Sequence, residues 1–205
     1  RVAGATEARA ADLLAADRAV ESPEPIPSAW QQRAAEAGLE TALTATFPTV
    51  ILAGEANRLV SAKAVTDGYP LRGALRIQAT PGARETRPDG IPAPGTAWVE
   101  SRLLGLLDLS VGESFAIGAI ELRVAGVLSF EPDRGQGFSS LAPRVMFNHA
   151  DLNATELLGP GSRVRHKLLL AGPTQTVIAF TDRLAAEQGN AVEIETPAGQ
   201  GRGTG

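Results

Sequence analysis

Hydrolysis by a nucleophilic side chain needs a serine or cysteine held close to a histidine, and this sequence offers few such residues. It contains no cysteine and only two histidines, His149 and His166. The G-x-S-x-G turn that exposes a catalytic serine is missing, and the nearest fragment, Gly137-Phe138-Ser139-Ser140, lacks the second glycine. A pairing of Ser139 with His149 remains a remote serine hydrolase alternative. We predict that the chain is not an enzyme and has no catalytic residues.

Metal and nucleotide sites also lack their usual patterns. The absence of cysteine excludes disulfides and thiolate metal sites. Glu131 and Asp133 stand two residues apart in a glycine-rich segment, a faint calcium pattern, but the spacing of an EF-hand and its closing glutamate are missing. Residues 199–205 are rich in glycine but fail the G-x-G-x-x-G spacing, and no Walker A motif is present. We expect no metal, no cofactor and no ATP hydrolysis by this chain itself.

The segment from Glu131 to Phe138 is the candidate for contact with another protein. Glu131, Asp133 and Arg134 place fixed charges among glycines, and Phe138 adds an aromatic ring. We predict that these four residues belong to a partner-contact loop, and an ordinary solvated connection between strands is the alternative. Trp98 is predicted to anchor the junction of two lobes rather than to touch a ligand.

The overall composition is that of a folded domain with no basic character. Hydrophobic residues make up 43% of the 205 residues, which is enough to bury a core in one large domain or two small ones. The formal net charge of −4 and the aromatic content of 4% argue against nucleic acid as a partner. No apolar run reaches the ~18 residues that span a bilayer. Because the sequence begins with Arg1, we expect a fragment of a longer protein.

Helices and strands are predicted to alternate at both ends of the chain. Ser28 and Gln31 match a capping box at the start of a helix, and Gly38 is placed to end it. Pro48 predicts an edge position or a bulge in the strand that contains it. The predicted elements are a helix over 4–16, a strand over 17–22, a helix from 28, a hairpin of 43–52 with 59–65, a strand over 164–170, a helix from 173 and a strand over 191–196.

The middle of the chain has a different pattern. Residues 80–96 are rich in proline and glycine and predict a connector, a short leucine-rich helix follows over 103–107, and a short helix is expected over 151–158. Gly118-Ala119 predicts a type II′ hairpin turn. With that turn Ile117 faces Ile120 and Phe115 faces Leu122, so all the apolar side chains share one face.

These elements predict an α+β fold with two lobes. The two ends of the chain, residues 1–78 and 163–196, approach a ferredoxin-like split βαβ lobe with two helices on one face of a sheet. Residues 79–162 form an inserted, mainly β lobe. Residues 197–205 are expected to form a flexible tail because they are too rich in glycine to fold alone.

Two stretches carry a resemblance to a known family. They are Phe47 to Ile77 (FPTVILAGEANRLVSAKAVTDGYPLRGALRI) and Ala97 to Leu152, which includes the run EPDRGQGFSSLAPR. Both resemble the periplasmic MacB-like core domain of FtsX-like ABC transporter permeases, and most closely the YbbP-type permeases, relatives of MacB, LolC and LolE. The likeness covers about residues 17 to 196 and concerns packing and turns rather than catalytic signatures.

The resemblance implies a porter lobe interrupted by a sabre lobe, on the periplasmic or extracytoplasmic face of the inner membrane. It implies a membrane helix before the chain and three after it, a separate ABC ATPase subunit and a second permease domain. Such domains are expected to act as levers that transmit ATP-driven motion. The family also implies lipid or hydrophobic cargo, lipoprotein-related export, and a periplasmic esterase or lysophospholipase-like partner. A ligand-binding module for a hydrophobic molecule is the alternative function.

Overall fold

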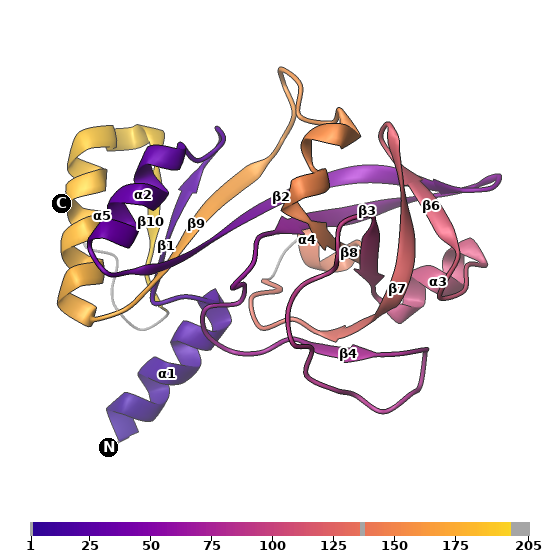
Figure 1. Cartoon of the computed structure of the whole chain (residues 1–205), viewed down its shortest axis with the longest axis horizontal. Helices are drawn as coiled ribbons and strands as arrows, with labels where there is room; N and C mark the ends of the chain where they lie inside the picture. The colour runs from indigo at the N-terminus through magenta and orange to yellow at the C-terminus, as the bar shows by residue number, and fades with distance from the viewer. Residues whose placement is uncertain (1, 136–137, 198–205) are drawn as a thin grey trace.

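The computed structural model describes residues 2–135 and 138–197, and within them ten strands join into one sheet (Figure 1). The strand order is β10-β1-β9-β2-β3-β8-β5-β7-β4, and β6 pairs with both β2 and β7. The predicted α+β class is confirmed. The strands are β1 (Arg18–Ser22), β2 (Glu40–Ala53), β3 (Ala56–Val65), β4 (Arg76–Gln78), β5 (Thr96–Val99), β6 (Ser114–Ile117), β7 (Ile120–Phe130), β8 (Arg144–Asn148), β9 (Arg165–Ala171) and β10 (Glu193–Glu195). The helices are α1 (Val2–Leu14), α2 (Ser28–Glu36), α3 (Ser101–Leu107), α4 (Phe138–Leu141) and α5 (Thr174–Gln188), with 3-10 turns at His149–Asp151, Asn153–Thr155 and Gly189–Ala191.

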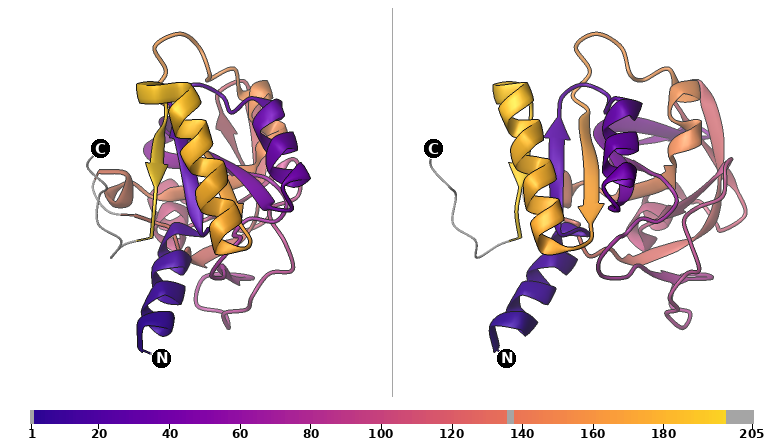
Figure 2. Two further views of the ribbon diagram at one scale, coloured as in Figure 1. Left: turned by 90° about the vertical axis from the view of Figure 1, so that its left-hand side faces the viewer. Right: turned by 60° about the vertical axis from the view of Figure 1, so that its left-hand side comes forward.

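The two ends of the chain share the first four strands of this sheet. β10, β1, β9 and β2 are neighbours, and each pair is antiparallel. α2 and α5 lie on the same face of these strands (Figure 2), where Arg33 and Glu187 join them through bonds of 3.0 and 3.2 Å. Because side chains alternate along a strand, only one set of residues in β1 and β9 faces the helices. The buried members of this cluster are Val20, Ala34, Leu39, Leu168, Leu170, Val177, Phe180 and Leu184.

The long hairpin of β2 and β3 carries the sheet from these strands into the middle of the chain. β3 pairs with β8 in parallel, β8 with β5, and β5 with β7. Pro48 lies between Thr46, where pairing with β9 ends, and Ile51, where pairing with β6 begins, so its missing N–H faces no partner strand. A large apolar cluster forms here and includes Phe47, Ile51, Val60, Leu103, Phe115, Leu122, Val124 and Phe147.

The hairpin of β6 and β7 has the predicted register. Ile117 pairs with Ile120 and Phe115 with Leu122, and Phe115, Ile117 and Leu122 are buried. Gly118 has φ +55° while Ala119 does not have a positive φ, which is the pattern of a type II′ turn. Alternating apolar residues and a glycine at the first turn position therefore set both the pairing and the buried face.

Two local predictions were wrong. Ser28 does not cap α2 with its side chain, because Pro27 occupies the cap position in an extended conformation and Ser28 is the first helical residue. Residues 151–158 do not form an α-helix. Two 3-10 turns occur instead, since the Thr155 hydroxyl donates to the carbonyl of Leu152 at 2.7 Å, and Glu156 then adopts a left-handed conformation with φ +58°.

Both ends of the described chain leave the fold at the same edge. Ala19, at the start of β1, pairs with Glu195, the last residue of β10. α1 ends just before β1 and extends away from the sheet (Figure 2). Among the described residues, no helix has the length and apolar character needed to cross a membrane.

The close contact at Gly118 generates a prediction about stability. A Cβ atom at this position would lie 2.1 Å from the carbonyl oxygen of Thr155, which also accepts a hydrogen bond from the Ala119 N–H. Gly54 has a similar φ of +58° but open space around it. Gly54→Ala should lower the free energy of unfolding by about 1–2 kcal/mol through backbone strain alone, and Gly118→Ala by ~1–3 kcal/mol more. Equal losses for the two variants in urea unfolding would contradict this.

Candidate functional site

The ammonium group of Lys63 lies at the centre of a buried cluster of polar side chains. Its Nζ donates to the hydroxyl of Tyr69 at 2.9 Å and to carboxylate oxygens of Glu131 and Asp133, both at 2.7 Å. The side chain of Lys63 is only 3% exposed. The three N–H groups of the ammonium are thus matched by three acceptors, two of them charged. This arrangement fixes the segment after β7 against β3.

Arg144 completes the pairing of the buried carboxylate. Its Nε donates to the second oxygen of Glu131 at 2.9 Å, and its Nη1 donates to the carbonyl of Ser61 at 3.3 Å. Ser61 and Arg144 are also partners in the parallel pairing of β3 with β8. One glutamate therefore joins residues from two adjacent strands, and its two oxygens are used by different cations.

Arg134 extends the cluster toward the start of α3. Its Nε donates to Glu100 at 3.1 Å, and its Nη2 donates to the carbonyl of Ala142 at 2.7 Å. The same oxygen of Glu100 accepts the backbone N–H of Arg144 at 3.1 Å. We call these side chains the junction network: Ser61, Lys63, Tyr69, Glu100, Glu131, Asp133, Arg134 and Arg144.

The surroundings in the junction network shift the pKa values of Glu131 and Tyr69 in opposite directions. Burial alone would raise the pKa of Glu131, but Lys63 and Arg144 outweigh burial and lower that pKa to about 2. Burial, followed by the charges of Asp133 and Glu131, raises the pKa of Tyr69 well above its ordinary value of about 10. At neutral pH the glutamate is therefore ionised and the phenol is neutral, which are the forms that accept from Lys63 and donate to Asp133.

The structure brings three of the four predicted loop residues into this network. Glu131 is buried, and Asp133 and Arg134 are partly buried, so their charges point into the protein. Phe138 is the first residue of α4, and its side chain, like that of Ser139, lies outside the described residues. Contact of this loop with a partner stays a prediction.

Trp98 lies in β5 and is 8% exposed. It packs in an apolar cluster that lies on the face of the sheet opposite α2 and α5 and includes Ala15, Tyr69, Leu75, Leu128, Met146 and Leu169. The cluster joins residues from the first strands with residues from the middle of the chain. A role as the anchor of the lobe junction remains a prediction.

The two carboxylates considered for calcium binding are used within the protein. Glu131 and Asp133 accept from Lys63 rather than being open to a cation. Within the described part of the chain, no group of three or more metal-ligating side chains is found. Burial lowers the pKa of His149 and also that of His166, which lies in β9.

Five members of the junction network were not predicted from the sequence: Ser61, Lys63, Tyr69, Glu100 and Arg144. In the segment from Val60 to Val65 the apolar residues alternate with Ser61 and Lys63, a pattern that predicts a solvent-facing lysine, yet all six residues are buried. A charged residue inside such a strand needs a buried partner of opposite charge. The partner could not be identified from spacing, since Glu131 is 68 residues away along the chain.

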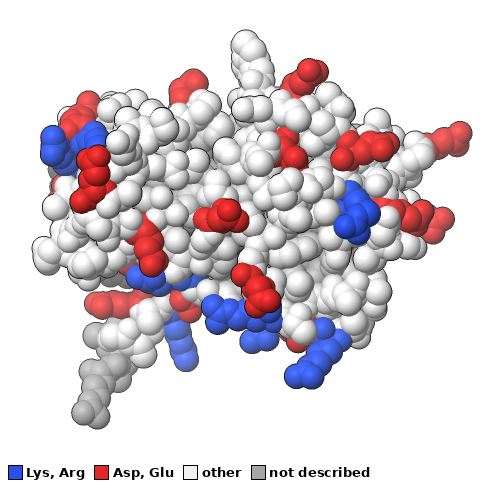
Figure 3. Space-filling view, viewed as in Figure 1, with Lys and Arg blue, Asp and Glu red and all other residues white. Residues whose placement is uncertain are grey.

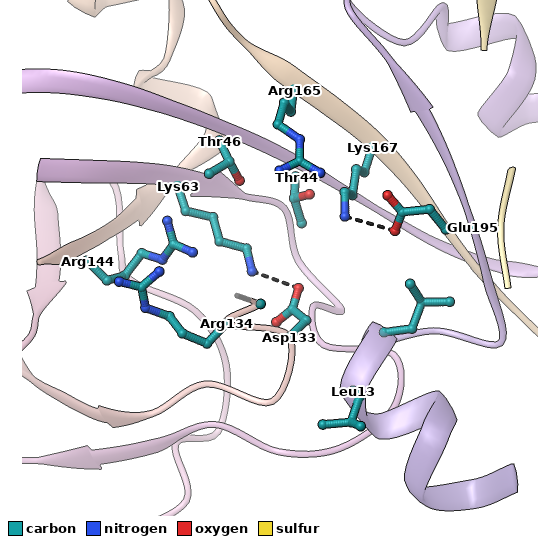
Figure 4. A pocket seen from close by; sticks show the side chains of 12 residues that line it. Leu13, Thr44, Thr46, Lys63, Asp133, Arg134, Arg144, Arg165, Lys167 and Glu195 are labelled. Carbon is teal, nitrogen blue, oxygen red and sulfur yellow. Dashed lines mark hydrogen bonds and ion pairs between the residues drawn. The ribbon is translucent and has the colours of Figure 1, made fainter. Parts of the chain in front are cut away.

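A polar cavity of about 260 Å³ lies beside the junction network (Figure 4). Its floor follows the sheet: Thr46 of β2 is paired on one side with Arg165 of β9 and on the other with Lys63 of β3, while Thr44 is paired with Lys167. α1 and the segment after β7 form the walls. The lining residues are Leu13, Leu14, Thr44, Thr46, Lys63, Asp133, Arg134, Gly135, Arg144, Arg165, Lys167 and Glu195.

Carboxylates orient the cations of this cavity. Lys167 donates to Glu195 at 2.9 Å, and Arg165 donates to Glu21 at 2.6 Å. Figure 3 shows Lys and Arg side chains gathered along the lower edge of this face, on the side where α1 emerges, whereas the upper edge carries mainly Asp and Glu. The residues that line the cavity are themselves mainly cationic among the charged ones.

Removing the charge of Glu131 generates a pH-dependent prediction. Glu131→Gln should lower the free energy of unfolding by about 3–5 kcal/mol near neutral pH, because Lys63 and Arg144 lose a buried partner. The pKa of Glu131 falls from 4.5 to about 2 on folding, so its contribution is complete above about pH 4.5 and is lost as the pH falls toward 2. The stability difference from the unmodified chain should shrink over that range in urea titrations. Glu55→Gln, at an exposed carboxylate in the turn between β2 and β3, is the control and should change stability little; a constant difference for Glu131→Gln would contradict the pairing.

Comparison with known proteins agrees with the family resemblance. No family model matches the chain. Over 162 residues, 78% of its length, the chain is 36% identical to the uncharacterized ABC transporter permease YbbP of Escherichia coli (strain K12), of which it spans 19%.

Two solved structures share the fold at low identity. The periplasmic region of MacB from Actinobacillus actinomycetemcomitans matches with a TM-score of 0.55 and 9% identity, covering 88% of this chain and 89% of the other. The extracellular domain of the ABC-type transporter YknZ from Gram-positive bacteria matches with a TM-score of 0.57 and 11% identity, covering 87% and 100%. The sequence relationship and the shared fold lead to one conclusion: this chain belongs to the MacB-like periplasmic domains of FtsX-like ABC transporter permeases.

Proposed function

We propose that this domain transmits ATP-driven motion on the extracytoplasmic side of the membrane, as part of a permease that works with an ABC ATPase. The observation that carries the proposal is that both ends of the fold lie at one edge of a single continuous sheet. Ala19 and Glu195 are paired at that edge, and the turn of the β2–β3 hairpin at Gly54-Glu55 lies at the far side (Figure 1). A movement applied where the chain enters and leaves would displace the far side as one body.

The bonding between the two parts of the chain supports a rigid lever. We assign residues 1–78 and 163–196 to a porter-like lobe with a ferredoxin-like split βαβ arrangement, and the order β10-β1-β9-β2 with α2 and α5 on one face supports it. Residues 79–162 form the inserted sabre-like lobe. Strands β2 and β3 continue from the first lobe into the core of the second, and Lys63 binds Glu131 and Asp133 across the junction. Buried ionic contacts resist separation of the two lobes, because moving one ion away would leave the other charge buried without a partner.

Partner contacts belong to the same proposal. We place a second permease domain beside this one and a protein partner against the loop after β7. The inward charges of Glu131, Asp133 and Arg134 hold that loop in position, and Leu141 of α4, 70% exposed, offers an apolar contact. Lipid or other hydrophobic cargo, export related to lipoproteins, and an esterase or lysophospholipase-like partner are proposed from the family resemblance alone. We place the domain in the periplasm, attached to the inner membrane.

The lever proposal predicts a specific pattern of distances in the full-length permease with its ATPase. The chain itself contains no cysteine, so after replacement of any cysteine elsewhere in the assembly, spin labels can be placed at Glu55→Cys and Arg183→Cys, two exposed positions on opposite sides of the domain. The distance between the two labels should be the same with and without ATP, while the distance between Glu55→Cys labels on two copies should change.

The same labels provide the control. Glu131→Gln should broaden the distances within one domain, because the junction loses a buried ion pair. A large ATP-dependent change within the domain, or no change between copies, would contradict transmission by a rigid lever.

A further inference from the structure

The cavity beside the junction network has hydrogen-bond donors that the protein itself does not use. The side chain of Thr44 belongs to a residue that is 2% exposed, yet its hydroxyl forms no hydrogen bond within the described part of the chain. Since the described residues contain no fully buried polar side-chain atom without a partner, this hydroxyl must reach the cavity surface. Thr46, two residues along the same strand, lines the same cavity with a second hydroxyl (Figure 4).

The charged residues add further open donors around these hydroxyls. Lys167 uses one N–H for Glu195. Arg165 uses Nε and Nη2 for Glu21, and Arg144 uses Nε and Nη1 for Glu131 and Ser61. The remaining nitrogen-bound hydrogens of these three side chains have no acceptor within the described residues. The donors come from β2, β8 and β9, so they approach the cavity from several directions.

The balance of charge favours an anion as the ligand. Five cationic side chains and two carboxylates line the cavity. Both carboxylates are already engaged, Asp133 by Lys63 and Tyr69 and Glu195 by Lys167. Burial, and then the hydrogen bond with Glu21, raise the pKa of Glu195. Glu21 and Glu131 do not line the cavity and instead hold the cations in place, as supporting residues do in preorganised sites.

Size and geometry narrow the ligand class. The volume of about 260 Å³ lies below the ~300–1,000 Å³ of pockets that enclose drug-sized molecules. Converging hydroxyl, ammonium and guanidinium donors suit a compact group with several equivalent oxygens, and phosphate accepts such charge-assisted bonds from all sides. A planar carboxylate would leave part of this set of donors unused.

We propose that this cavity binds a phosphate group, held by Thr44, Thr46, Arg144, Arg165 and Lys167. The group comes either from a soluble phosphate compound or from the head group of an amphiphile. Leu13, 66% exposed, and Leu14 stand at the cavity wall on α1, at the edge where the chain enters and leaves the fold. Binding of phosphate does not require that the domain act as a lever.

The test is titration of the isotopically labelled chain with potassium phosphate, followed by the amide signals of Thr44, Thr46 and Lys167, with potassium chloride at equal ionic strength as the reference. Phosphate should shift these signals in a saturable way. Thr44→Val and Lys167→Gln should each weaken binding by about tenfold or more, the loss expected for one hydrogen bond to a charged group.

Matched variants separate the site from general effects. Thr49→Val removes a hydroxyl from the same strand outside the cavity, and Arg183→Gln removes a charge from α5, so both should bind phosphate as the unmodified chain does. If Lys167→Gln fails to fold, Thr44→Val decides the question, because it replaces a hydroxyl by a methyl group of similar size. No saturable shift beyond that of chloride, or equal binding by all variants, would overturn the proposal.

Two further probes identify the source of the phosphate. If the ligand is the head group of an amphiphile, dihexanoyl phosphatidate should bind more tightly than glycerol phosphate, and Leu13→Asn should remove the difference. If the ligand is a soluble phosphate compound, the two probes should bind equally and Leu13→Asn should have no effect. Because the chain alone is used, failure of phosphate binding would leave the ATP-dependent distances of the lever experiment untouched.

Discussion

The buried ammonium of Lys63 is the interaction on which the rest of this structure depends. Transfer of an unpaired charge from water to a protein interior costs several kcal/mol, so the charge must be surrounded by acceptors. Glu131, Asp133 and Tyr69 supply these acceptors. Tyr69 lies in the segment after β3, and the two carboxylates lie in the segment after β7. Their convergence fixes the segment after β7 on the sheet, and Arg144, which shares Glu131, fixes β8 beside β3. The same arrangement forms one wall of the cation-lined cavity. The fixed position of the segment after β7 and the polar cavity are thus two results of one buried charge.

The two faces of the sheet differ in what covers them. On one face α2 and α5 cover an apolar cluster, and β1 and β9 alternate so that Val20, Leu168 and Leu170 reach it. On the other face Thr44, Thr46 and Lys167 lie at a polar surface that is bounded by the end of α1. An apolar cluster around Trp98 and Met146 continues the second face toward the middle of the chain. Because α2 and α5 cover only one face, hydrogen-bond donors remain available on the other face, near the edge where the chain enters and leaves the fold.

The sequence predicted correctly the elements that depend on patterns among neighbouring residues. The hairpin at Gly118 was predicted in full register, because alternation and a turn glycine act over neighbouring residues. The capping box at Ser28 and the helix over 151–158 were wrong, since Pro27 and the hydroxyl of Thr155 supplied competing local geometry. The loop residues Glu131, Asp133 and Arg134 were identified, but their inward direction was not. Lys63 and Glu131 are far apart in sequence, and only the folded sheet brings them together.

The titration of Tyr69 tests the central claim most directly, because the chain contains one tyrosine. Its hydroxyl donates to Asp133 and accepts from Lys63, and burial with the nearby carboxylates raises its pKa well above about 10. Because the pKa of Tyr69 is raised in the folded state, its contribution to the free energy of unfolding is complete below its ordinary pKa. That contribution is lost as the pH rises from there through the pKa of the folded state. Tyrosinate absorbance in the near ultraviolet should therefore appear only together with unfolding, followed in parallel by circular dichroism. Ionisation near the ordinary pKa in a chain that stays folded would contradict the buried junction network.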